Sequence, residues 1–65
     1  MTTAELNALP DGTKVKSPSG IEYEMASHPC GNRWLQQTRK NKQGDPYGAH
    51  IPTTGTTRTF DGWTA

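Results

Sequence analysis

The chain has 65 residues, enough for one small domain, and a domain of this length buries only about 60% of the surface that its unfolded form exposes. Its apolar fraction of 29% allows one small core, and its net charge of +1 lacks the basic excess of a dedicated nucleic-acid binder. The single cysteine excludes an internal disulfide, and no apolar run approaches the roughly 20 residues of a membrane span. These features favour a cytoplasmic protein that does not act at a membrane.

The first predicted element is a short N-terminal helix. Thr2, with Glu5 three residues later, matches a capping box. Leu6 and Leu9 lie on one face of such a helix and would cover the core. Pro10 prevents the helix from continuing. A frayed N-terminus is the alternative.

Residues 14–25 alternate between apolar and charged side chains and predict a β-hairpin. The sequence Ser-Pro-Ser-Gly at residues 17–20 matches a type I turn. This turn predicts one register for the two strands, in which Lys16 faces Glu22, Val15 faces Tyr23 and Lys14 faces Glu24. In that register the lysine–glutamate pairs share one face, and the core side receives Val15, Ile21, Tyr23 and Met25.

The rest of the chain predicts shorter elements. Residues 33–40 predict a third strand, because a hairpin needs a further strand for its apolar face; a short helix is the alternative. Residues 41–55 form a long polar loop that could be functional, disordered, or could hide a short strand near residues 49–51. Residues 56–60 are rich in threonine and predict another strand.

Together these elements predict an all-β fold class in a single domain, residues 1–65. The expected architecture is a small, antiparallel, open barrel of four to five strands, with a short N-terminal helix or turn over one end. In so short a chain a barrel protects the strand edges better than a flat sheet does. Trp63 is expected to pack back on the core or to contact a partner.

Residues 9–24, "LPDGTKVKSPSGIEYE", also carry a resemblance. The residues that carry it are Leu9, Pro10, Gly12, Thr13, Val15, Gly20 and Tyr23, with Trp34 on a later strand. This pattern resembles the opening of small Src-homology-like β-barrel proteins of actinobacteria and their bacteriophages. The resemblance implies a viral accessory protein that binds something in its host, so that its location would be the host cytoplasm. It implies no active site.

Catalysis and metal binding find little support in the sequence. Cys30 has a candidate base in His28 or His50, but nothing orients that base, and the chain offers little volume for a pocket. His28, Cys30, His50 and Asp45 are candidate metal ligands, but they lack the paired spacing of a structural zinc site. We therefore predict a protein that is not an enzyme and has no metal or cofactor.

Two kinds of binding site remain. A nucleic-acid site would combine Arg33, Trp34, Arg39 and Lys40, because cations beside an aromatic ring suit a single strand. A protein site would use arginines and aromatic side chains, which most often anchor interfaces; Tyr47 is expected at a loop tip. We predict binding to a host protein, with nucleic acid as the alternative, through Arg33, Trp34, Arg39, Lys40, Tyr47 and Trp63. A homodimer that shares Trp63 is a further alternative.

Overall fold

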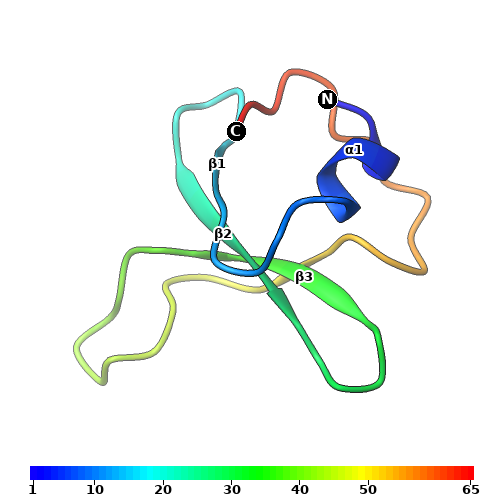
Figure 1. Cartoon of the computed structure of the whole chain (residues 1–65). Coiled ribbons are helices and arrows are strands. Elements are labelled where there is room, and N and C mark those ends of the chain that lie inside the picture. The colour runs from blue at the N-terminus through cyan, green and yellow to red at the C-terminus, as the bar shows by residue number, and fades with distance from the viewer.

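A computed structural model describes residues 1–65 and shows one open, four-stranded antiparallel sheet with a short helix (Figure 1). In chain order the elements are α1 (Thr3–Asn7), β1 (Lys14–Lys16), β2 (Glu22–Ser27), β3 (Arg33–Gln37) and β4 (Ile51–Pro52). The strands lie in the sheet in the order β1-β2-β3-β4. The predicted antiparallel sheet and N-terminal helix are therefore confirmed; the predicted small open barrel is not confirmed.

Helix α1 begins with the predicted capping box. The Thr2 hydroxyl accepts a hydrogen bond from the Glu5 backbone N–H (3.1 Å), and the Glu5 carboxylate accepts one from the Thr2 N–H (2.9 Å). The hydrogen bond from the Thr2 backbone N–H to the Glu5 carboxylate, followed by the interaction with the Thr2 side chain, lowers the pKa of Glu5. Leu6 is buried, so the helix covers the core as its spacing predicts. No helix in the structure has the length and apolar character needed to cross a membrane.

The β1–β2 hairpin has the predicted register. Lys14 pairs with Glu24, Val15 with Tyr23 and Lys16 with Glu22. The turn closes with a hydrogen bond from the Gly20 N–H to the Ser17 carbonyl oxygen (2.9 Å), and Gly20 has a φ of 89°, which favours glycine. The prediction is wrong for one side chain: Ile21 is 42% exposed. It follows the turn directly and faces Ser17, outside the paired part of the hairpin.

Strand β3 confirms the predicted third strand. It pairs with β2 so that Leu35 lies beside Met25, and both side chains are buried. The other face carries Trp34 and Gln36, because successive side chains of a strand point to opposite faces. Strand β4 adds to the far edge, where Ile51 pairs with Leu35. A short strand near residues 49–51 is one of the three alternatives predicted for residues 41–55, and the structure has it at Ile51–Pro52.

The predicted strand at residues 56–60 is wrong. This segment has no ladder partner and passes around the core as irregular chain, shown in orange in Figure 1. The C-terminal residue that pairs with the sheet is Thr64, which exchanges two backbone hydrogen bonds with Lys16 (2.7 and 3.1 Å). Threonine has a high β-propensity, which is why the composition predicts a strand. Packing decides the conformation of this segment instead.

The core consists of seven buried residues, Leu6, Val15, Tyr23, Met25, Leu35, Phe60 and Trp63. The Trp63 ring lies 5.1 Å from the Tyr23 ring and 5.7 Å from the Phe60 ring, centroid to centroid. Burial of each large apolar side chain stabilises the fold by about 1.5–3 kcal/mol. The aromatic end of the chain therefore completes a core that the sheet alone would leave open.

Candidate functional site

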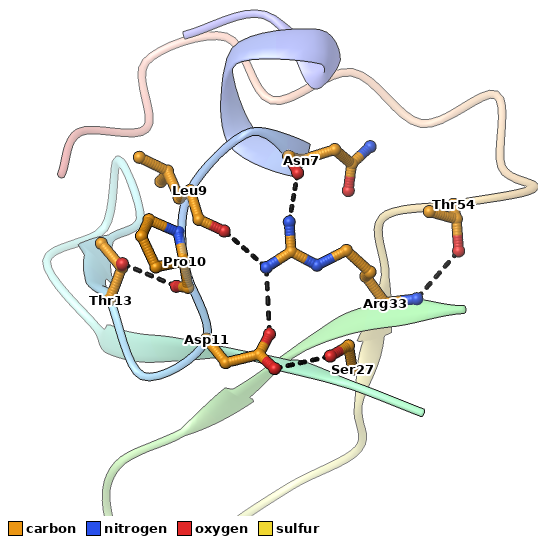
Figure 2. A network of polar contacts seen from close by, with 8 residues as sticks. All are labelled: Asn7, Leu9, Pro10, Asp11, Thr13, Ser27, Arg33 and Thr54. Atoms are coloured by element: carbon orange, nitrogen blue, oxygen red, sulfur yellow. Dashed lines mark hydrogen bonds and ion pairs between the residues drawn. The ribbon is translucent and has the colours of Figure 1, made fainter. Parts of the chain in front are cut away.

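Arg33 is held in a network of polar contacts between α1 and the sheet (Figure 2). Its guanidinium donates hydrogen bonds to the carbonyl oxygens of Asn7 and Leu9 and to the Asp11 carboxylate (3.0 Å). The second Asp11 carboxylate oxygen accepts a hydrogen bond from the Ser27 hydroxyl (2.6 Å). The hydrogen bonds from Ser27 and then Arg33 lower the pKa of Asp11. Arg33 was predicted as a binding residue; its side chain, 16% exposed, is engaged within the protein.

Further hydrogen bonds hold α1 at the same end of the molecule. The Asn7 side-chain amide donates a hydrogen bond to the Thr53 carbonyl oxygen (2.6 Å). Thr53 in turn donates its N–H to the Arg33 carbonyl oxygen (3.0 Å), and the Arg33 N–H donates to the Thr54 hydroxyl (3.0 Å). Helix α1, β3 and the segment after β4 are thus joined around Arg33.

Beyond β3 the chain forms a second hairpin, residues 38–47. Lys40 forms a bridge with Pro46, and the Tyr47 N–H donates to the Arg39 carbonyl oxygen (2.8 Å). The side-chain oxygen of Asn41 accepts hydrogen bonds from the backbone N–H groups of Gln43 (2.9 Å) and Asp45 (3.0 Å), which stabilises the turn. The hairpin projects from the sheet on the side away from α1 (Figure 1).

This hairpin changes the predicted position of Tyr47. The tip lies earlier, at residues 42–44, and Tyr47 lies at the base, opposite Arg39. The Arg39 guanidinium lies over the Tyr47 ring, 4.8 Å from its centroid, a cation–π contact worth about 0.5–1 kcal/mol at an exposed site. None of the hydrogen bonds or ion pairs of the structure uses that guanidinium. Its N–H donors are therefore available to another molecule.

Tyr47 and Ile21 are the two large hydrophobic residues that the structure leaves exposed, at 48% and 42%. They line one shallow depression of about 360 Å³. We call it the Tyr47 surface, and its residues are Ile21, Glu22, Gln37, Thr38, Arg39 and Tyr47. One of its polar groups is already paired: the Glu22 carboxylate accepts a hydrogen bond from the Thr38 hydroxyl (2.9 Å). The surface thus combines exposed apolar area with one free guanidinium.

Trp34 lies on the outer face of the sheet and is not among the residues that line the Tyr47 surface. Its ring is 5.5 Å from the His50 ring, and its indole N–H donates to the Gln36 side chain (3.3 Å). A depression of about 460 Å³ lies beside it, between β3 and β4. The one basic residue in its lining is Arg33, whose guanidinium is bonded to Asp11 and to carbonyl oxygens. No free cation accompanies this aromatic pair.

The structure therefore divides the predicted binding residues. Arg39 and Tyr47 lie together, and Lys40 belongs to the same hairpin. Arg33 lies six positions before Arg39, which corresponds to about 20 Å along an extended strand. Trp63 is 6% exposed and belongs to the core, so a homodimer that shares Trp63 has no free indole to share.

Besides the position of Tyr47, sequence reasoning also predicted the burial of Ile21 wrongly. Strict alternation predicts that it points inward with Tyr23. The contrary signal is its partner: in the predicted register Ile21 faces Ser17, a residue of the turn, rather than another apolar residue. The exposure of Ile21 could therefore be recognised from the sequence, because it is an apolar residue at the end of a hairpin with no apolar residue opposite.

Lys14 lies opposite Glu24 on the outer face of the sheet. The Lys14 ammonium donates to the Glu24 carboxylate (2.7 Å), and the Gln36 amide donates to its second oxygen (3.3 Å). The hydrogen bond from Lys14 is the largest cause that lowers the pKa of Glu24, followed by that from Gln36; the charge of Lys40 adds to the effect. Lys14 is therefore neutralised, as the sequence predicts.

Of the candidate catalytic and metal residues, the structure brings together His28 and Cys30, and it places His50 and Asp45 elsewhere. His28 Nδ1 lies 3.0 Å from the Cys30 sulfur in the exposed turn between β2 and β3. His50 packs on Trp34 instead, and Asp45 belongs to the hairpin of residues 38–47. No group of three or more histidine, cysteine or acidic side chains is placed to hold a metal ion.

Comparisons with models of protein families, with curated proteins and with solved structures found no match to this chain. The site is thus defined by its own geometry.

Proposed function

We propose that this chain is a non-enzymatic binding protein that recognises a protein partner through the Tyr47 surface. The observation that carries the proposal is the exposure of Ile21 and Tyr47 side by side with a free Arg39 guanidinium. Tyrosine and arginine are enriched among the residues that carry binding energy at interfaces. The other large apolar side chains of the chain are buried or half-buried, so the exposure of these two supports a contact surface.

We also propose a biological setting for this function. The resemblance of residues 9–24 to Src-homology-like barrels of actinobacteria and their bacteriophages supports a bacteriophage accessory protein that binds and modulates a host protein in the host cytoplasm. The bridge between Lys16 and Thr64 extends the sheet beyond β1, which supports the proposed barrel-like closure.

The test is binding of a host partner to the wild-type protein and to two variants. Tyr47→Ser combined with Ile21→Ser removes the exposed apolar area, and we expect the partner to be lost. Trp34→Ser is the control in a separate depression, and we expect it to retain the partner. Loss of binding with Trp34→Ser and retention with the double variant would contradict the proposal.

Nucleic-acid binding is the second candidate. Seven residues are basic and two of them, Lys14 and Arg33, make ion pairs. Three of the remaining five lie in the hairpin of residues 38–47, namely Arg39, Lys40 and Lys42. Affinity for nucleic acid falls steeply with salt concentration, whereas an aromatic-anchored protein contact weakens little. The variant Arg39→Glu combined with Lys40→Glu would abolish nucleic-acid binding.

A further inference from the structure

We propose that the Tyr47 surface binds a protein segment in which a single carboxylate side chain stands beside a large aliphatic side chain. The inference rests on the proposed function, since it specifies the partner of the same surface. Three features of the surface carry it: the Arg39 guanidinium, the exposed pair Ile21 and Tyr47, and the carboxylate of Glu22.

The Arg39 guanidinium suits a carboxylate. A guanidinium presents its N–H groups as a planar fork that matches the two oxygens of a carboxylate. The Tyr47 ring under it restricts its motion, and the hydrogen bond from the Tyr47 N–H to the Arg39 carbonyl oxygen holds the two residues in register. Less conformational freedom is therefore lost when the carboxylate binds.

Ile21 and Tyr47 suit an aliphatic neighbour. They lie on the border of the same depression as Arg39, and each is nearly half exposed. An aliphatic side chain placed between them would remove apolar surface from water on both sides of the contact. A segment with a carboxylate alone would leave this area uncovered.

Glu22 restricts how much negative charge the segment carries. Its carboxylate lies in the same depression, is bonded to the Thr38 hydroxyl, and has no basic partner. A second anion next to the first would face this carboxylate and be repelled. A nucleic-acid strand carries a charge on every phosphate, so one isolated carboxylate fits the surface better than a polyanion does.

The surrounding charges favour the approach of an acidic segment. The hairpin of residues 38–47 holds three basic residues and one acidic residue, Asp45. Lys40 and Lys42 make no ion pair and lie beside the surface along the chain. Unpaired charges at the rim of an interface accelerate association with a partner of opposite charge.

Four pools of octapeptides with acetylated and amidated ends test the inference by NMR titration of the isotope-labelled protein. The first pool carries one Asp or Glu among Leu, Ile and Val; the second replaces the acid with its amide, the third replaces it with Lys, and the fourth keeps the acid among Ser and Gly. We expect the first pool to shift the resonances of Ile21, Arg39 and Tyr47 at the lowest concentration. The second and fourth pools should need about tenfold more peptide, because a charged hydrogen bond or an apolar contact is lost.

Two variants test whether Arg39 is the residue that binds the carboxylate of the peptide. Arg39→Lys keeps the positive charge and removes the fork, and we expect about tenfold weaker binding of the first pool. Arg58→Lys is the matched control: Arg58 is exposed and unpaired like Arg39, lies outside the surface, and its change should leave the binding unaltered. A second set of peptides with free C-termini distinguishes a side-chain carboxylate, which we propose, from a terminal one.

The outcomes separate this inference from the proposed function. Equal binding of the acidic, amide and lysine pools at Ile21 and Tyr47 would overturn the inference that the bound segment carries a carboxylate. The proposal that the Tyr47 surface binds a protein would then still stand. Absence of any shift at these residues with all pools would count against both. Tighter binding of an oligothymidylate than of the first pool at Arg39 would overturn the inference in favour of nucleic acid.

Discussion

Two arginines near the ends of β3 show how differently one residue type is used in this molecule. Arg33, at the start of the strand, is 16% exposed and bonded to two carbonyl oxygens and the Asp11 carboxylate. Arg39, just after the strand, lies on the ring of Tyr47 and donates no hydrogen bond within the protein. The first holds α1 on the sheet, and the second is free to contact another molecule.

The difference follows from what surrounds each guanidinium. The end of α1 and the turn after it supply carbonyl oxygens that need donors, because the last carbonyls of a helix have no partner within the helix. In the hairpin of residues 38–47 the carbonyl oxygens of Arg39, Asn41 and Asp45 accept hydrogen bonds from the hairpin's own backbone, and no acceptor bonds the Arg39 guanidinium. Arg33 lies beside the carbonyl oxygens of Asn7 and Leu9, which have no other donor, whereas Arg39 lies on an aromatic ring. The surroundings of each arginine, rather than the residue type, thus distinguish the end that holds α1 from the end that carries the Tyr47 surface.

The largest expected difference in the free energy of unfolding is between a variant of the core and a variant of the Tyr47 surface. Leu35→Ala removes a fully buried side chain and should lower the free energy of unfolding by about 2–5 kcal/mol, enough to unfold most of so small a domain. Ile21→Ala removes an exposed side chain and should change it by less than about 1 kcal/mol. Urea denaturation followed by tryptophan fluorescence measures both. A similar loss in the two variants would mean that Ile21 belongs to the core.

The next effect compares the two arginines directly. Arg33→Ala leaves the carbonyl oxygens of Asn7 and Leu9 without a donor, and we expect a loss of about 1–3 kcal/mol. Arg39→Ala removes one exposed cation–π contact, and we expect a loss below about 1 kcal/mol. Denaturation midpoints of the two variants provide the measurement. The account fails if Arg39→Ala proves the more destabilising.

A smaller effect on stability is expected at two glycines, Gly44 in the hairpin of residues 38–47 and Gly48 directly after it. Gly48 has a φ of 78°, and a Cβ there would lie 3.0 Å from the Gln37 amide, which lines the Tyr47 surface. Gly48→Ala should cost about 1–2 kcal/mol in backbone strain and should also displace Gln37. Gly44→Ala is the matched control, since its φ is 84° but a Cβ there meets nothing within 4 Å.

We expect both glycine variants to lose stability. Only Gly48→Ala should shift the resonances of Gln37 and Tyr47 in a heteronuclear NMR spectrum. Equal shifts of these two residues in Gly44→Ala would show that the surface responds to strain in the hairpin rather than to the contact at Gln37.

The smallest effect is on the pH dependence of stability. Folding lowers the pKa of Asp11 below its ordinary value of 3.8, so the unfolded chain binds more protons in that range. The contribution of Asp11 is fully present above about pH 5 and is lost as the pH falls through the lowered pKa. Asp11→Asn should reduce the slope of the unfolding midpoint between pH 5 and pH 2. An unchanged slope in Asp11→Asn would contradict the role given to the Arg33 network.

The sequence predicts the local parts of this fold well. The register from Lys14 to Glu24 follows from turn chemistry, alternation and charge, which all lie within a dozen residues. The capping box of Thr2 and Glu5 is equally local. Both were confirmed because neighbouring residues alone determine them.

The long-range parts could not be predicted in the same way. The partners of Arg33 include carbonyl oxygens of Asn7 and Leu9, which carry no side-chain signal at all. Residues 56–60 have strand composition but no strand to pair with once Phe60 enters the core. The contact between Arg39 and Tyr47 depends on the turn that Asn41 forms, which shifts the tip of the loop by several residues.

The central claim is that the hairpin of residues 38–47 holds Arg39 on the Tyr47 ring before any partner binds. Proton NMR of the side-chain methylenes tests it most directly, because an aromatic ring shifts protons above its face upfield. We expect the Arg39 methylene protons to lie upfield of those of the exposed Arg58, and to return to the positions of Arg58 in Tyr47→Leu. Arg39 protons at the Arg58 positions in the wild-type protein would contradict the claim.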